Sequence, residues 1–85
     1  MEMGVGHLAD QIRLKVDTHE LPRDFPPKVW AGHGNEHACH ACMQPIVPEQ
    51  VSYEFDAGDH RTYCFHAGCF DLWQAELRRR GWLLR

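Results

Sequence analysis

The chain has 85 residues, of which 44% are hydrophobic and 25% are charged, a composition typical of one soluble globular domain. At this size a hydrophobic core alone gives marginal stability, and a bound metal or disulfides often supply the rest. Nine Lys and Arg residues against twelve Asp and Glu residues give a net charge of -3, which argues against a module that binds duplex DNA.

The first residues and the cysteines together indicate a reducing compartment. Residues 1–7 lack the basic region and long apolar stretch of a secretory signal, and no apolar run is long enough to span a bilayer. We therefore expect a cytoplasmic protein that does not associate with membranes. Its four cysteines are then reduced thiols, available to a metal rather than paired in disulfides.

The first predicted element is a short amphipathic helix over residues 6–18. Its apolar residues recur at helical spacing and form a narrow stripe between polar ones; they are Val5, Leu8, Ile12 and Val16. We expect this stripe to cover one side of the core. The alternative is an interaction helix, which requires the stripe to be exposed.

A proline-rich connector follows over residues 20–34. Its three prolines remove backbone donors and disfavour helix, so the segment is predicted to be extended. Trp30 is the expected anchor of this segment on the core, and two glycines near its end give the loop conformational freedom. Residues 1–35 are thus expected to pack on a second unit formed by residues 36–85.

Two short pairs of cysteine and histidine carry the chemistry of the chain. Cys39-x-x-Cys42 is followed after 23 residues by His66-x-x-Cys69. Two residues between ligands let a tight turn direct both side chains at one ion, and the long gap lets the two pairs come from different elements. The pattern predicts one Zn²⁺ per chain, held tetrahedrally by these four side chains. Pro45 follows the first pair too closely for the helix of a thioredoxin-like redox site.

A β-hairpin is predicted between the two pairs. Apolar and polar residues alternate over residues 51–56, as in a half-buried strand with Val51, Tyr53 and Phe55 on its inner face. Residues 56–59 have the composition of a turn. The alternation resumes over residues 62–66 with Tyr63 and Phe65, which puts His66 at the end of the second strand, on the face opposite these aromatic residues.

The last predicted element is a helix over residues 67–80. Its apolar face would pack on the hairpin and consists of Phe70, Trp73 and Leu77. Gly81 is the expected helix stop, and the arginines at 78–80 lie in the last turn, where cations suit the helix dipole. The apolar tail at 82–84 is expected either to fold back or to meet a partner.

Together these elements predict a small metal-stabilised α+β fold. A zinc knuckle, a β-hairpin and a C-terminal helix form a treble-clef-like arrangement, preceded by the N-terminal amphipathic helix. Because binding energy at such metal sites is largely folding energy, the metal-free chain is expected to be poorly folded.

Cys64 is the one competitor for a place at the metal. It shares a strand face with His66, but four residues separate Cys64 from Cys69, whereas His66 and Cys69 have the usual spacing of two. We therefore favour His66 and interpret Cys64 as a small buried hydrophobic residue. His37 and His40 lie near the first pair and are expected to be solvated loop residues.

Several motifs resemble those of a family of small uncharacterised bacterial zinc-binding proteins. The likeness extends from Leu8 to Leu77 and rests on Leu21-Pro22-Arg23, Val29-Trp30-Ala31-Gly32-His33-Gly34, Cys39-His40-Ala41-Cys42 with Pro45-Ile46, and His66-Ala67-Gly68-Cys69-Phe70 with Trp73 and Glu76. Ala31 and Cys64 depart from the family pattern. The resemblance implies the same four ligands and carries no established activity. A looser likeness to half of a LIM domain rests on ligand spacing alone.

The leading functional hypothesis is a monomeric, non-enzymatic zinc module that binds another protein. Four protein ligands close the metal site, whereas a catalytic zinc keeps an open position. One alternative is a nucleic-acid-binding zinc finger that uses the arginines at 78–80 with Arg85 and Trp82, although the net charge disfavours it. Another is a metal or redox sensor that acts through Cys64 beside the site.

Overall fold

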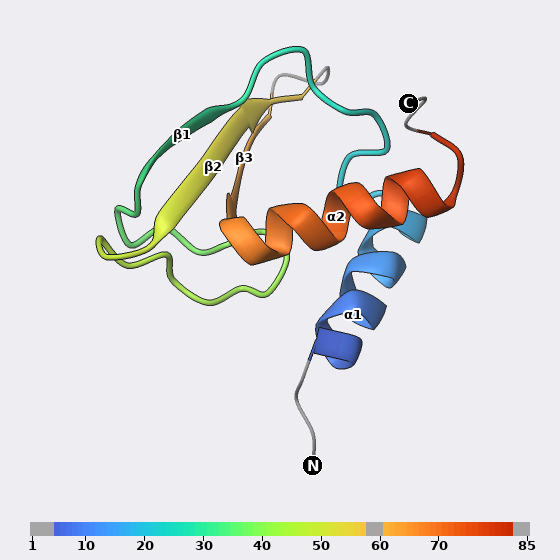
Figure 1. Ribbon diagram of the computed structural model, residues 1–85, viewed down its shortest axis with the longest axis horizontal. Coiled ribbons are helices and arrows are strands. Elements are labelled where there is room, and N and C mark those ends of the chain that lie inside the picture. Colours follow the sequence, from blue (N-terminus) through green and yellow to red (C-terminus); the bar gives the residue numbers. More distant parts are fainter. Residues whose placement is uncertain (1–4, 58–60, 83–85) are drawn as a thin grey trace.

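The computed structural model describes residues 5–57 and 61–82 and contains two helices and three strands (Figure 1). In chain order, the elements are α1 (Val5–Asp17), β1 (Trp30–His33), β2 (Val51–Asp56), β3 (Thr62–His66) and α2 (Ala67–Arg79). The three strands form one antiparallel sheet in the order β1-β2-β3. The prediction of a small α+β fold is confirmed.

Helix α2 is the central element, because it contacts the sheet on one side and α1 on the other (Figure 1). The predicted inner face of α2 is confirmed, since Phe70, Trp73 and Leu77 are all buried. The ring of Phe55 in β2 stacks on that of Trp73 with 5.2 Å between centroids, and Tyr53 meets Phe70 edge-on at 4.8 Å. Aromatic packing between α2 and the sheet therefore forms the centre of the core.

The predicted hairpin is confirmed, but Val51, at one end of its predicted inner face, is not buried. Phe55 and both aromatic residues of β3 are buried, whereas Val51 is 46% exposed and its neighbour Ser52 is buried instead. Val51 pairs with the exposed His33 of β1 at the end of the sheet. Alternation predicts the face on which a residue lies, but the extent of the covering helix decides whether that residue is buried.

Helix α1 uses its predicted stripe to pack against α2. Ile12 and Val16 are fully buried in the same hydrophobic cluster as the residues of α2. The side chain of Val5 lies outside the described residues. Because α2 covers the stripe, the alternative of an interaction helix lacks the exposed apolar surface that it required. The N-terminal segment and the cysteine-containing part of the chain share one core.

The prediction that Trp30 anchors the connector on the core is wrong. Trp30 is 51% exposed, and the buried anchor is Leu21. The Nε1 of Trp73 also donates a hydrogen bond of 3.0 Å to the carbonyl of Pro22, and Phe25 stacks on the Trp73 ring. Trp30 instead belongs to β1, a third strand that the sequence analysis did not predict, and its side chain points to the face of the sheet away from α2.

Helix α2 ends as predicted. Gly81 has a φ of +80°, and the N–H of Trp82 donates to the carbonyl of Leu77 at 2.9 Å, while the N–H of Gly81 donates to that of Arg78 at 3.0 Å. These two bonds are those of a Schellman motif, which requires the left-handed conformation that glycine adopts without strain. Of the predicted apolar tail, residues 83 and 84 lie outside the described residues.

Candidate metal centre

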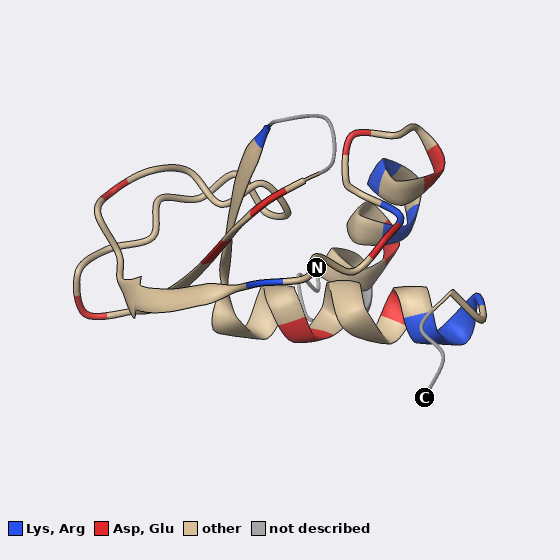
Figure 2. Cartoon of the chain, turned by 90° about the horizontal axis from the view of Figure 1, so that it is seen from above, with Lys and Arg blue, Asp and Glu red and all other residues tan. Residues whose placement is uncertain are grey.

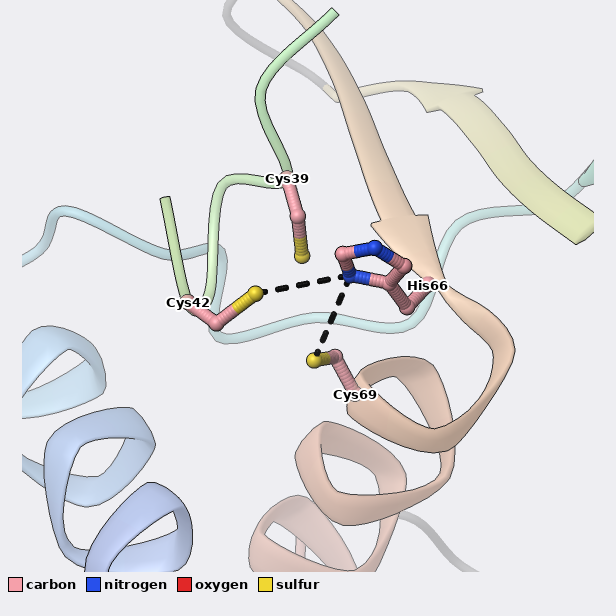
Figure 3. Close-up of side chains that lie close together, drawn as sticks. All are labelled: Cys39, Cys42, His66 and Cys69. Atoms are coloured by element: carbon pink, nitrogen blue, oxygen red, sulfur yellow. Dashed lines mark hydrogen bonds between the residues drawn. The ribbon is translucent and has the colours of Figure 1, made fainter. Parts of the chain in front are cut away.

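Four side chains converge where the end of β3 meets the start of α2 (Figure 3). Their potential ligand atoms all lie within 4.8 Å of one another. Two come from the loop before β2, one from the end of β3 and one from the first turn of α2; they are Cys39, Cys42, His66 and Cys69. The structure thus brings together all four residues that the spacing predicted, in an arrangement that could hold a metal ion.

The first pair lies on a tight turn, residues 38–45, which we call the cysteine turn. An isolated β-bridge joins its two ends, and the N–H of Cys39 donates to the carbonyl of Gln44 at 2.8 Å. The N–H of Met43 donates to the carbonyl of Cys39 at 2.8 Å, and the N–H of Ala41 lies 3.4 Å from the Cys39 sulfur. These bonds fix the backbone so that both sulfurs point inward.

The ring of His66 is held with Nδ1 toward the sulfurs (Figure 3). Nδ1 lies 3.4 Å from the sulfur of Cys42 and 4.0 Å from that of Cys69. On the other side of the ring, Nε2 lies 3.1 Å from Oε1 of Gln50 and 3.2 Å from the carbonyl of Pro45. Both partners are acceptors, so Nε2 carries the proton and Nδ1 offers a lone pair to the ion. Gln50 is a functional residue that the spacing did not indicate.

The second pair spans the start of α2. His66 is the N-cap residue of this helix, with extended backbone angles and no side-chain capping bond, so its ring is free to face the cysteines. Cys69 is the third residue of α2. The first turn of a helix carries a partial positive charge that stabilises an anion nearby, and Cys69 therefore lies where a thiolate is favoured.

The cysteines influence one another's ionisation. A hydrogen bond from Cys69 lowers the pKa of the Cys39 thiol to about 4, and the same contact raises the pKa of Cys69. Burial raises the pKa of Cys42. Without a metal, therefore, one thiolate is stabilised by its neighbours, which keep their protons. A divalent cation would replace those protons and bring all three sulfurs to the thiolate form.

Two of the distances between the four candidate ligand atoms are close to those around a tetrahedral ion. Ligand bonds of about 2.3 Å to sulfur and about 2.0 Å to nitrogen imply separations of about 3.8 Å between sulfurs and about 3.6 Å between sulfur and nitrogen. The observed distances of 3.4 and 4.0 Å between Nδ1 and two of the sulfurs lie on either side of this value. Cys39 and Cys69 are buried, so the group is shielded from water on the side of the core.

Cys64 lies outside this group. Its sulfur donates to the carbonyl of Ala38 at 3.3 Å, and the residue is buried, as predicted. His40 is an exposed turn residue, as expected; in addition, its Nδ1 accepts a hydrogen bond of 3.2 Å from the N–H of Cys64, and its ring lies 4.9 Å from that of Tyr63. His37 is exposed, as expected.

A hollow of about 520 Å³ lies on the Cys64 side of the cysteine turn. The sheet contributes Glu54, Thr62 and Cys64 to its lining, and the loop contributes His37, His40 and Met43, among others. Cys39 also lines it. Of the four candidate ligands, Cys39 alone lines this hollow, and it is fully buried.

No protein-family model, curated protein or solved structure matches the chain. Within residues 5–57 and 61–82, neither helix has the length and apolar character needed to cross a membrane.

Proposed function

We propose that Cys39, Cys42, His66 and Cys69 bind one Zn²⁺ in a closed structural site. The observation that carries this proposal is the orientation of His66, whose Nε2 faces two acceptors while Nδ1 faces the sulfurs. Three sulfurs and one imidazole are a donor set that favours zinc over harder cations. In this proposal the cysteine turn is a zinc knuckle, and knuckle, hairpin and α2 form a treble clef.

The same donor set supports a structural rather than a catalytic role. Four protein ligands complete a tetrahedron and leave no position for a substrate or an activated water. The ion would join the cysteine turn to the start of α2, so its binding energy would stabilise the whole fold. We therefore propose that the chain is a monomeric protein-interaction module and that its metal maintains the binding surface.

Native mass spectrometry of the purified chain tests the metal site directly. Wild type and the Cys64→Ser variant are expected to hold one zinc per chain, whereas His66→Ala loses it. Cys64→Ser is the matched control, because Cys64 shares the strand of His66 but points elsewhere. Loss of zinc from Cys64→Ser with retention in His66→Ala would refute the ligand set and reopen the case for an enzyme.

Nucleic-acid binding through the clustered arginines is less favoured, because two of the three already form ion pairs with carboxylates of the same chain. Arg79 pairs with Glu76 at 2.6 Å, and Arg80 pairs with both Glu76 and Asp17. Arg78 remains exposed. Binding to single-stranded nucleic acid with a steep salt dependence would support this alternative, and the absence of binding at low salt would refute it.

The sensor alternative depends on Cys64. Burial raises the pKa of its thiol, which lowers the fraction of reactive thiolate. Cys64 and Cys39 both line the same hollow, which places Cys64 beside the metal centre. Loss of zinc on mild oxidation in wild type, but not in Cys64→Ser, would support a sensor.

A further inference from the structure

The rest of the fold covers one edge of the sheet and leaves the other open. At the outer edge of β3, the N–H of His40 donates to the carbonyl of Cys64 at 2.9 Å, and the N–H of Cys64 donates to the ring of His40. The cysteine turn therefore covers this edge. At the outer edge of β1, no described residue outside the sheet hydrogen-bonds to the backbone of Ala31 or His33, and the whole strand is exposed.

The register of the ladder shows which groups of β1 face outward. Gly34, directly after β1, donates its N–H to the carbonyl of Gln50 at 2.9 Å, in line with the β1–β2 register. Residues bonded to one neighbour alternate along an antiparallel strand, so every second residue before Gly34 also bonds to β2. The N–H and C=O groups of Ala31 and His33 consequently point away from the sheet. Such unpaired groups are a template for another strand.

Apolar side chains flank this open edge on both faces of the sheet. On one face lies the exposed ring of Trp30, next to its β2 partner Glu54. The Nζ of Lys28 lies 5.7 Å from the centre of that ring, so a basic side chain of the partner would share the ring with Lys28 or displace it. On the other face lie Ala31 and His33 of β1, with the exposed Val51 of β2 next to His33. An added strand would therefore place alternate side chains beside Trp30, with Glu54 one strand further in, and beside Ala31 and His33, with Val51 one strand further in.

The charge near the open edge of β1 indicates which charge the partner carries. The segment from Lys28 to Ala57 contains four acidic residues and one basic residue, Lys28 itself, and Zn²⁺ with three thiolates would add one further negative charge. Figure 2 shows acidic segments on the sheet and its loops, whereas most of the Lys and Arg segments lie on the helices and the connector. The sheet end of the molecule is thus an acidic lobe, which attracts basic partners.

We propose that the open edge of β1 binds an extended segment of a partner protein, in which Lys or Arg alternates with apolar residues. The segment would add a fourth strand through the backbone groups of Ala31 and His33. Its basic side chains would face Trp30 and Glu54, and its apolar ones would lie on the side of Val51. This inference rests on the proposed function as a protein-interaction module and specifies its surface and the chemistry of its partner.

The test uses the zinc-bound full chain and a capped octapeptide of alternating Lys and Val as the probe. Backbone amide shifts in an NMR titration are expected to change first over residues 30–33. A Glu-Val octapeptide of the same length is the charge control, and we expect it to bind at least about tenfold more weakly at low salt. Added salt is expected to weaken the binding of the Lys-Val peptide.

A proline on the open edge separates strand addition from general attraction. Ala31→Pro removes an outward N–H without breaking the ladder to β2, a position at which edge strands tolerate proline. We expect this variant to bind the Lys-Val peptide at least about tenfold more weakly, whereas Ala31→Ser, which keeps the N–H, binds it like wild type. His33→Pro repeats the test at the other outward position should Ala31→Pro fail to fold.

Four results would overturn the proposal. They are equal binding of the Glu-Val peptide, unchanged binding by a folded proline variant, no binding at millimolar peptide, and a wild-type chain that is already a dimer through β1. Native mass spectrometry of the same samples counts the zinc. A chain that holds one zinc but fails these tests refutes the strand-addition surface alone, whereas a folded chain without zinc refutes the proposed function.

Discussion

The ammonium group of Lys15 donates a hydrogen bond of 2.9 Å to the carbonyl of Ala41, the residue directly before Cys42. The same group lies 3.1 Å from the carbonyl of His40. Lys15 belongs to α1, so the N-terminal helix holds the backbone of the cysteine turn between its two candidate ligands. It also places a positive charge beside a group of sulfurs that becomes negative when a metal binds.

Replacing Lys15 by Met is expected to weaken metal binding several-fold. The variant keeps an apolar stem but loses two bonds from a charged donor, which together contribute about 1 to 2 kcal/mol to the free energy of unfolding. Competition with a chromophoric chelator measures the affinity. Lys15→Arg should restore part of the effect, and Lys28→Met, which removes a cation remote from the cysteine turn, should have none. An affinity for Lys15→Met equal to that of wild type would contradict the role of this contact.

Gln50 is expected to control metal affinity through His66. Its Oε1 accepts a hydrogen bond from Nε2 of His66 and another from the N–H of Val47 at 3.1 Å, so Gln50→Ala should lower the zinc affinity about tenfold. Gln50→Glu keeps an oxygen at this position and should retain the affinity. Gln44→Ala, which alters an exposed side chain near the site, is the control. If Gln50→Ala and Gln44→Ala bind zinc equally well, Gln50 does not orient the ring.

Local spacing was enough to predict the candidate ligands. A ligand pair separated by two residues is a constraint within one turn, so the sequence distinguishes His66 from Cys64 without knowledge of the tertiary structure. The buried stripe of α1 and the glycine that ends α2 are local signals of the same kind. These features are therefore predictable wherever the pattern repeats within a few residues.

The parts that the sequence did not reveal depend on contacts between distant residues. Lys15 meets the cysteine turn 26 residues along the chain, and Gln50 meets His66 across 16; no local pattern marks either pair. Strand β1 has four residues, including a glycine, and is too short for alternation to identify it. Trp30 was predicted to be buried because of its size, but its place on the edge strand leaves it exposed.

A matched pair of glycines tests the path of the chain into the metal centre. A Cβ at Gly34 would overlap the carbonyl oxygens of Ile46 and Val47, whereas one at Gly32 would meet nothing within 4 Å. Gly34→Ala must therefore displace backbone next to the cysteine turn, and we expect it to lower the free energy of unfolding by about 2 kcal/mol or more. Gly32→Ala should be close to neutral. Urea unfolding with zinc present measures both, and equal stability of the two variants would show that this close approach is absent.

Glu76 joins the two helices through a largely buried carboxylate. Its oxygens lie 2.6 Å from Nη2 of Arg79 and 2.5 Å from Nε of Arg80, and Nε of Arg13 on α1 lies 3.6 Å away. The hydrogen bond from Arg79 and, to a smaller extent, that from Arg80 lower the pKa of this carboxyl to about 2, although burial alone would raise it. Such a shift corresponds to about 3 kcal/mol of stability.

The pH dependence of this contribution follows from the direction of the shift. A carboxyl whose folded pKa lies below its unfolded value stabilises the fold fully above the unfolded pKa, about 4.3, and loses this contribution as the pH falls toward the folded value near 2. Glu76→Gln should therefore lower the free energy of unfolding by about 2 to 3 kcal/mol, equally at pH 7 and pH 5.5. Urea unfolding with excess zinc gives the difference at each pH, with the exposed Glu49→Gln as the control. A difference that shrinks between these two pH values would show that Glu76 titrates there, and that its arginine partners do not hold it in the charged form.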